Sequence, residues 1–276
     1  RTGHRRVGFF ALAEHAIDPH QPLPSLRIVG LVLEPRGQPL DHAADHLQAR
    51  FDELLAKLPD GIDINRVNCW HKANRWVYDL CCTPAVLNYV EDLLGPEFYL
   101  WGCHFFCKLL GGSSEVPWHQ DAQYWPLTPH ETVTVWLALY DTDDSNGAMR
   151  VVAGSHRVGL VDHGSVGGEQ FVLNQAIDES AFAPEDVVTI DLQAGQMSLH
   201  DDRLIHGSGP STSGRRRVGL TMRFSPNRVK CDLGVWPNFE AYPMRGTDPE
   251  PLNPIGEIPQ GDDCPTSMFQ LSSEFS

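Results

Sequence analysis

The chain has 276 residues, of which 41% are hydrophobic and 21% are charged, as in ordinary globular proteins. A chain of this length buries roughly three quarters of its unfolded surface, so its core needs no disulfides. Acidic residues outnumber basic residues by 36 to 21, giving a formal charge of −15. We therefore expect no nucleic-acid partner, because a phosphate backbone would be repelled.

Apolar runs and cysteines bear on the compartment. The longest apolar runs, such as residues 133–140, are too short to span a bilayer, so we expect no membrane insertion. No charged segment followed by an apolar one opens the chain, although a start at Arg1 leaves a removed leader open. Seven cysteines, odd in number and without a CxxC pair, favour free thiols and a cytoplasmic location.

The first elements follow from proline content and apolar spacing. Residues 1–39 carry five prolines and one short apolar run, Leu26–Leu33, which predicts an irregular start with one strand. Apolar residues then recur at helical spacing over residues 40–58, until Pro59 stops the pattern. This segment is predicted to be an amphipathic helix.

A second helix is indicated by its caps. Thr83 suits the N-cap, Pro84 suits the first helical position, and the apolar pattern ends at Gly95. The spacing therefore predicts a helix over residues 84–94.

From residue 98 the chain changes to short β-rich runs with no helical pattern between them. Helices followed by closely spaced strands favour a mainly β, α+β fold, a double-stranded β-helix (jelly roll, cupin-like) with the helices packed on one side. We expect one domain over residues 1–276, with helical support at about 40–95, a jelly-roll core at about 98–225 and a C-terminal, loop-rich extension at about 226–276. The predicted strands are 98–110, 133–140, 149–152, 186–192, 197–200 and 218–224.

Three residues suggest a metal site. His119 and Asp121 stand two positions apart, so in a strand they project from one face and aim an imidazole and a carboxylate at one point. His206, 85 residues after Asp121, would complete the set from a neighbouring strand. Two histidines and a carboxylate leave three positions of the metal open, as in non-haem Fe(II) oxygenases. With thirteen histidines in the chain, this pair needs a second element in support.

That element is Arg217, which lies 11 positions after His206. The strand that follows it is predicted to form a hairpin beside the strand that carries His206. A guanidinium near the metal suits a dicarboxylate cosubstrate, since its fork binds one carboxylate while the other end chelates iron. Arg215 and Arg216 are interpreted as a solvated basic turn.

A wider set of motifs resembles the phytanoyl-CoA hydroxylase (PhyH) family of Fe(II)/2-oxoglutarate-dependent dioxygenases, over about residues 64–224. No motif suffices alone, but together they are specific. They are Thr83-Pro84 to Gly95-Pro96, Pro117-Trp118-His119-Gln120-Asp121 with Tyr124-Trp125-Pro126, Thr134-Val135-Trp136, Asn146-Gly147-Ala148, Gly154-Ser155-His156, and His206-Gly207-Ser208-Gly209 with Arg217.

The resemblance implies an enzyme that uses Fe(II), 2-oxoglutarate and O2 to hydroxylate an unactivated C–H bond of a small molecule, with release of succinate and CO2. It implies that His119, Asp121 and His206 ligate Fe(II). It also implies that Arg217 holds the far carboxylate of 2-oxoglutarate, with the Ser208 hydroxyl beside it. Related halogenases carry a small residue in place of the carboxylate, so Asp121 favours hydroxylation or another oxidation.

The resemblance implies further cosubstrate contacts. Trp136 would line the cosubstrate pocket, Gln120 stands between the ligands, and Arg66 lies in a segment where the family has a basic cosubstrate-contacting residue. His104 falls where the family often has an apolar residue, and would either donate a hydrogen bond to 2-oxoglutarate or fill space. His156 is assigned to structure, because a fourth protein ligand would close the site.

Aromatic residues near the ligands, above all Trp125 with Tyr124, would shape a substrate pocket or equally fill the core. The substrate stays open among acyl thioesters, amino acids, amines, phosphonates and natural products, as do desaturation, cyclisation and epimerisation. The acidic surface mildly favours a neutral or cationic small molecule over a polyanion. The oligomeric state is open.

The rival hypothesis is a zinc-binding jelly roll, acting as a hydrolase or isomerase or as a non-catalytic binding module. Neither needs a clamp for a dicarboxylate. Arg217 therefore discriminates between the two.

Overall fold

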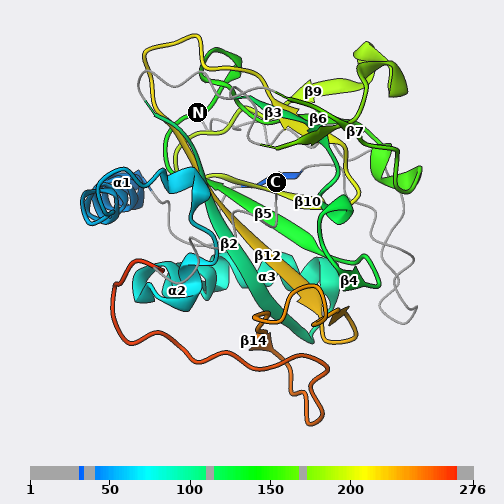
Figure 1. The fold of residues 1–276 in the computed structure, drawn as a ribbon. Helices are drawn as coiled ribbons and strands as arrows, with labels where there is room; N and C mark the ends of the chain where they lie inside the picture. Colours follow the sequence, from blue (N-terminus) through cyan, green and yellow to red (C-terminus); the bar gives the residue numbers. More distant parts are fainter. Residues whose placement is uncertain (1–30, 34–40, 110–114, 168–172, 266–276) are drawn as a thin grey trace, which may run out of the picture.

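Two β-sheets face each other, and helices cover the outer side of the larger one (Figure 1). The computed structural model describes residues 31–33, 41–109, 115–167 and 173–265. The larger sheet has the order β1 (Leu31–Leu33), β10 (Met197–Asp201), β5 (Val133–Ala138), β12 (Arg217–Pro226), β2 (Phe98–Lys108) and β14 (Tyr242–Arg245). The smaller sheet has the order β3 (Val116–His119), β11 (His206–Ser208), β6 (Arg150–Val152) and β9 (Val187–Thr189). Two short pairs join β4 (Leu127–Thr128) to β13 (Lys230–Cys231) and β7 (Gly164–Ser165) to β8 (Gln175–Ala176).

The α-helices of the described residues are α1 (Asp41–Ala56), α2 (Arg75–Cys81) and α3 (Pro84–Leu94). The predictions of α1 and α3 are confirmed, with Pro84 in the first turn of α3. Helix α2 was not predicted, because seven residues are too few to show a helical period. Its N-cap is Asn74, whose side chain accepts a hydrogen bond from the Val77 amide.

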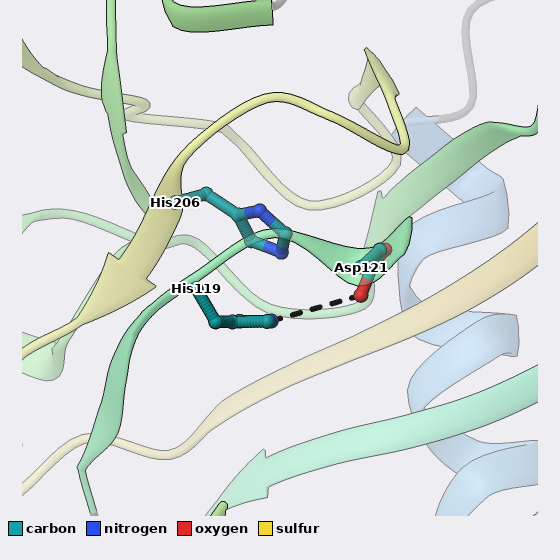
Figure 2. Close-up of side chains that lie close together, drawn as sticks. All are labelled: His119, Asp121 and His206. Atoms are coloured by element: carbon teal, nitrogen blue, oxygen red, sulfur yellow. Dashed lines mark ion pairs between the residues drawn. The ribbon is translucent and has the colours of Figure 1, made fainter. Parts of the chain in front are cut away.

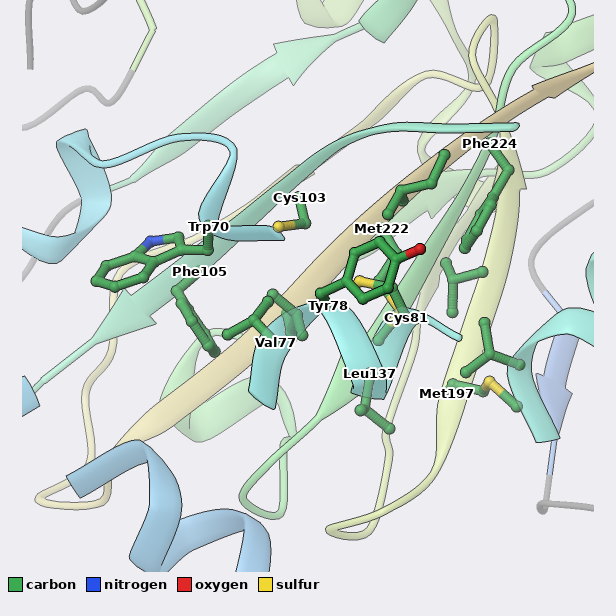
Figure 3. Packing of buried hydrophobic residues seen from close by; sticks show 14 of the residues in the cluster. Trp70, Val77, Tyr78, Cys81, Cys103, Phe105, Leu137, Met197, Met222 and Phe224 are labelled. Atoms are coloured by element: carbon green, nitrogen blue, oxygen red, sulfur yellow. The ribbon is translucent and has the colours of Figure 1, made fainter. Parts of the chain in front are cut away.

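The jelly-roll prediction is confirmed, and the alternation of side chains along the central strands explains the two layers. On β12, Val218, Leu220, Met222 and Phe224 pack into the core beneath the helices. The same core holds Trp70, Phe105, Val77 and Tyr78, drawn in Figure 3. The intervening residues of β12 face the space between the sheets, where the site lies.

The structure corrects the predicted hairpin. Strand β12 does not pair with β11, but lies between β5 and β2 in the larger sheet, while β11 belongs to the smaller one. The segment between Ser208 and Arg217 therefore crosses from one sheet to the other. Chain proximity suggested a hairpin, whereas the two-layer packing separates the strands.

The ends of the predicted elements also changed. The first strand is present as β1, and residues 26–30 lie outside the described residues, as does residue 110 of the predicted strand 98–110. The extension expected to be loop-rich contributes β14, which pairs with β2 at the sheet edge. None of the helices in the described ranges has the length and apolar character of a membrane span.

Candidate active site

His119, Asp121 and His206 converge between the sheets (Figure 2). His119 ends β3, and it pairs directly with His206, the first residue of β11. Asp121 opens a 3-10 helix after β3, so a turn rather than a shared strand face aims its carboxylate. One ligand atom from each residue lies within 4.8 Å of the others, and His119 Nε2 is 3.6 Å from Asp121 Oδ1.

Backbone carbonyls orient both imidazoles. His119 Nδ1 lies 2.8 Å from the Pro117 oxygen, and His206 Nδ1 lies 2.9 Å from the Leu204 oxygen. Because a carbonyl oxygen only accepts, each Nδ1 carries the proton and donates. Each Nε2 lone pair is then free toward the centre of the group, which is the arrangement of metal-ligating histidines.

Charge states fit a metal as well. Burial disfavours the Asp121 carboxylate, but the neighbouring His119 and His200 rings outweigh it and hold the pKa of Asp121 well below its usual range. Burial, with a smaller contribution from His119, lowers the pKa of His206. An ionised carboxylate and a neutral imidazole are the forms that bind a divalent metal.

Two residues beside Asp121 were not predicted. Thr134 Oγ1 donates to Asp121 Oδ2 at 3.3 Å, and His200 Nε2 lies 3.7 Å from the same oxygen. Neither ring nitrogen of His200, 2% exposed, has a hydrogen-bond partner in the described structure. The period of two along β10 is the signal that was available, since Met197 and Leu199 face the core and His200 faces the other way.

Arg217 lies at the opposite side of the same space and is held by three acceptors. Its Nε donates to the Gly147 oxygen at 3.0 Å, Nη1 to the Phe106 oxygen at 3.2 Å, and Nη2 to Ser208 Oγ at 2.9 Å. Gly147 has a φ of 76°, a conformation that favours glycine. The Asn-Gly turn therefore presents its carbonyl to the arginine.

Trp136 packs beside this arginine. Its ring centroid lies 5.6 Å from Arg217 Cζ, and a Cβ added to Gly219 would stand 2.0 Å from the indole. Only glycine fits under the ring at this position. A pocket of about 410 Å³ connects the arginine to the three converging residues. Its lining includes His119, Asp121, Thr134, Trp136, His200, His206, Ser208, Arg217, Thr221 and Arg223.

A family model described as phytanoyl-CoA dioxygenase (PhyH) matches residues 43–219, which is more than half of the chain. The chain belongs to the PhyH family. A probable alpha-ketoglutarate-dependent hypophosphite dioxygenase of Stutzerimonas stutzeri is 34% identical over 142 residues, 51% of this chain and 49% of that protein. A phytanoyl-CoA dioxygenase of Arabidopsis thaliana is 30% identical over 203 residues, 73% and 69% of the two chains.

This PhyH protein spans about half the length of several curated relatives that it matches. Among solved structures, the apo form of the non-heme monooxygenase ThoJ is 26% identical, with a TM-score of 0.66 over 85% of this chain and 86% of that one. EctD from S. alaskensis is 19% identical, with a TM-score of 0.61 over 82% and 80%. At that identity, EctD supports the fold alone.

Three cosubstrate contacts expected of a PhyH protein, Gln120, Arg66 and His104, are not among the residues that line the pocket. Gln120 is fully buried, and its side-chain amide makes hydrogen bonds to the backbone of Gly159, Val161 and Arg203. It therefore ties neighbouring loops to the segment that carries His119 and Asp121. Arg66 is exposed at the end of a 3-10 helix, Ile64–Arg66.

Of the two aromatic residues expected at the substrate, Tyr124 lies close to His119, but neither Tyr124 nor Trp125 is among the residues that line the pocket. The Tyr124 ring centroid is 6.0 Å from that of His119, and its hydroxyl donates to the Gln175 oxygen. Trp125 is buried against Trp101, with ring centroids 4.8 Å apart. His156, assigned to structure, is buried and does not line the pocket.

His104 of the PhyH protein is buried, and its neighbour Phe106 rather than His104 itself lines the pocket. Its Nε2 donates to the Asn65 oxygen at 2.7 Å, the geometry of a structural residue. Burial, with a smaller contribution from Arg223, lowers the pKa of His104 to about 3.

This depressed pKa predicts acid sensitivity. Between pH 6.5 and 3 the unfolded state binds one more proton at His104 than the folded state, so the free energy of unfolding falls as pH falls, by about 1.4 kcal/mol per unit. Urea unfolding at several pH values between 4.5 and 6.5 gives the free energy of unfolding. Its dependence on pH should be less steep for His104→Gln than for wild type. The exposed His46, changed to Gln, is the control. Identical slopes in wild type and His104→Gln would contradict the assignment.

Proposed function

We propose that the chain is an Fe(II)- and 2-oxoglutarate-dependent dioxygenase that hydroxylates an unactivated C–H bond of a small molecule. The observation that carries the proposal is one pocket with His119, Asp121 and His206 at one side and Arg217 at the other. Three buried ligand atoms fit a metal, and a buried guanidinium fits the far carboxylate of a dicarboxylate.

The residues have separate tasks in this proposal. His119, Asp121 and His206 would hold iron from one side and leave its other positions open. Arg217 and Ser208 would hold 2-oxoglutarate, and Trp136 would shield it from water. When bound, iron, 2-oxoglutarate and O2 supply the oxidation, with succinate and CO2 as coproducts. The chain contributes orientation and a buried setting, since each metal-site residue is less than 9% exposed.

Relatives support a small-molecule substrate. Their names include an L-proline trans-4-hydroxylase of Streptomyces griseoviridis and an ectoine dioxygenase of Streptomyces avermitilis. All seven cysteines of this chain are free thiols. These thiols support our proposal of a reducing compartment, the cytoplasm.

The proposal predicts a weak visible charge-transfer band when anaerobic protein receives Fe(II) and 2-oxoglutarate together. Chelation by the 2-oxo acid is the origin of the band, so Fe(II) with succinate is the control and should give none. Absorption spectra of the full chain test this. No band, together with tightly retained zinc, would replace the proposal with the zinc hydrolase or binding module.

A further inference from the structure

The pocket holds a second arginine. Arg223 lies six residues beyond Arg217 on β12, and side chains an even number apart share one face of a strand, so both point between the sheets. Arg223 is 9% exposed and lines the pocket with the metal-site residues. Because a strand rises about 3.3 Å per residue, the two arginines stand roughly 20 Å apart along β12.

Strand register places Arg223 beside the metal site. Arg223 is the cross-strand partner of Thr134 on β5, and Thr134 is paired on its other side with His200 on β10. Thr134 and His200 are the two residues that contact Asp121 Oδ2. Arg223, Thr134 and His200 thus form one row across the sheet, and Arg223 stands next to a residue that contacts Asp121, a proposed iron ligand.

The Arg223 guanidinium is held by aromatic rings rather than by an anion. Its Cζ lies 5.1 Å from the Trp125 ring centroid and 5.8 Å from that of Trp101. Gly102, opposite it on β2, makes room, since an added Cβ would stand 3.4 Å from Arg223 Cδ. Ring faces hold a cation without using its N–H donors.

Within the described part of the chain this charge has no direct hydrogen-bond or ion-pair partner, although Asp121 is near enough to attract it through space. No carboxylate oxygen there lies within 4.0 Å of an Arg223 nitrogen, and Nε, fully buried, makes no hydrogen bond. A buried charge without a partner is costly, and an arriving anion offsets that cost. Arg217, by contrast, already donates to three acceptors.

We propose that Arg223 binds an oxyanion of the substrate, a carboxylate or a phosphonate group, and thereby holds the substrate beside the metal. The inference rests on the proposed function and deepens it by naming a substrate class, a small acid. Arg217 serves the cosubstrate, so Arg223 is the arginine of the pocket lining that remains for the substrate. Arg217 would bind 2-oxoglutarate at one end of the pocket, and Arg223 would bind the acidic substrate at the other end.

The test compares an acid with its uncharged isostere. Ligand-observed NMR would measure the affinities of cyclohexanecarboxylate, cyclohexanecarboxamide and methylphosphonate for the full chain. Each titration is run on metal-free protein and again with Zn(II) and 2-oxoglutarate, which occupies Arg217. The variants are Arg223→Gln, Arg223→Lys and, as a matched control, Arg228→Gln, which removes a surface arginine paired with Glu131.

Wild type should bind the carboxylate or the phosphonate at least about 10-fold more tightly than the amide, as expected for a charge-assisted hydrogen bond. That preference should fall in metal-free Arg223→Gln and vanish in Arg223→Gln when 2-oxoglutarate occupies Arg217. It should persist in Arg228→Gln, with 2-oxoglutarate affinity unchanged in both variants. The anion that binds more tightly, the carboxylate or the phosphonate, identifies the charged group of the substrate. Failure of 2-oxoglutarate to bind would overturn the proposed function, while the metal-free titrations still report on Arg223.

Three results would overturn the inference. In the first, wild type binds neither anion better than the amide. In the second, Arg223→Gln keeps the preference for the anion. In the third, Arg223→Gln loses affinity for 2-oxoglutarate, which is the effect expected of an Arg217 variant. If Arg223→Gln does not fold, Arg223→Lys decides. Lysine keeps the charge without the planar fork, so anion affinity should fall several-fold, and an unchanged affinity would count against the inference.

Discussion

Replacing Asp121 with asparagine is expected to weaken Fe(II) binding by roughly 100-fold or more and to abolish 2-oxoglutarate turnover. The carboxylate is the one anionic member of the three converging residues. Loss of an outer-shell partner alone typically costs 10- to 100-fold in metal affinity, so loss of the ligand itself should cost at least as much. Anaerobic equilibrium dialysis with Fe(II) and a succinate-release assay measure the two effects.

Asp202 provides a matched control. It is a second buried aspartate near the site, but burial and the neighbouring Asp201 raise its pKa to about 8, so it is largely uncharged at neutral pH. Its Oδ2 accepts a hydrogen bond from the Thr132 amide rather than facing the metal site. Asp202→Asn should therefore keep metal affinity and turnover. Full activity in Asp121→Asn or in Asp121→Ala would refute the ligand set.

Much of the site could be predicted because its parts are short motifs. The HxD pair, the later histidine and Arg217 each carry their chemistry in a few neighbouring residues, and the fold brought them into one pocket. The prediction that His119 and Asp121 project from one face of a strand was wrong. Asp121 is aimed by a 3-10 turn, since β3 ends at His119.

Residues that depend on long-range packing escaped prediction. A period of two shows that Arg217 and Arg223 share a face, but not that this face meets the other sheet. The same limit applies to Gln120, because its position between two ligands suggested the pocket while its amide binds three backbone groups of other segments. Strand pairing between distant segments, such as β12 with β2, has no local signature in the sequence.

Replacing Arg217 with alanine is expected to raise the KM for 2-oxoglutarate by about 100-fold or more. A guanidinium binds a carboxylate through charge-assisted hydrogen bonds, each worth about 1.5 to 3 kcal/mol, and two of them correspond to a loss of at least that size. The buried Ser208 hydroxyl also loses its partner. Steady-state succinate release against 2-oxoglutarate concentration measures the effect.

A cosubstrate analogue separates the clamp from general damage. The acid 2-oxobutyrate keeps the metal-chelating end but lacks the far carboxylate, so wild type and Arg217→Ala should bind it equally well. Arg216→Ala, at the preceding residue, removes a partly exposed guanidinium that pairs with Asp52 and should leave the 2-oxoglutarate KM unchanged. If Arg217→Ala weakened 2-oxobutyrate as much as 2-oxoglutarate, the arginine would be supporting the fold of the pocket rather than holding a carboxylate.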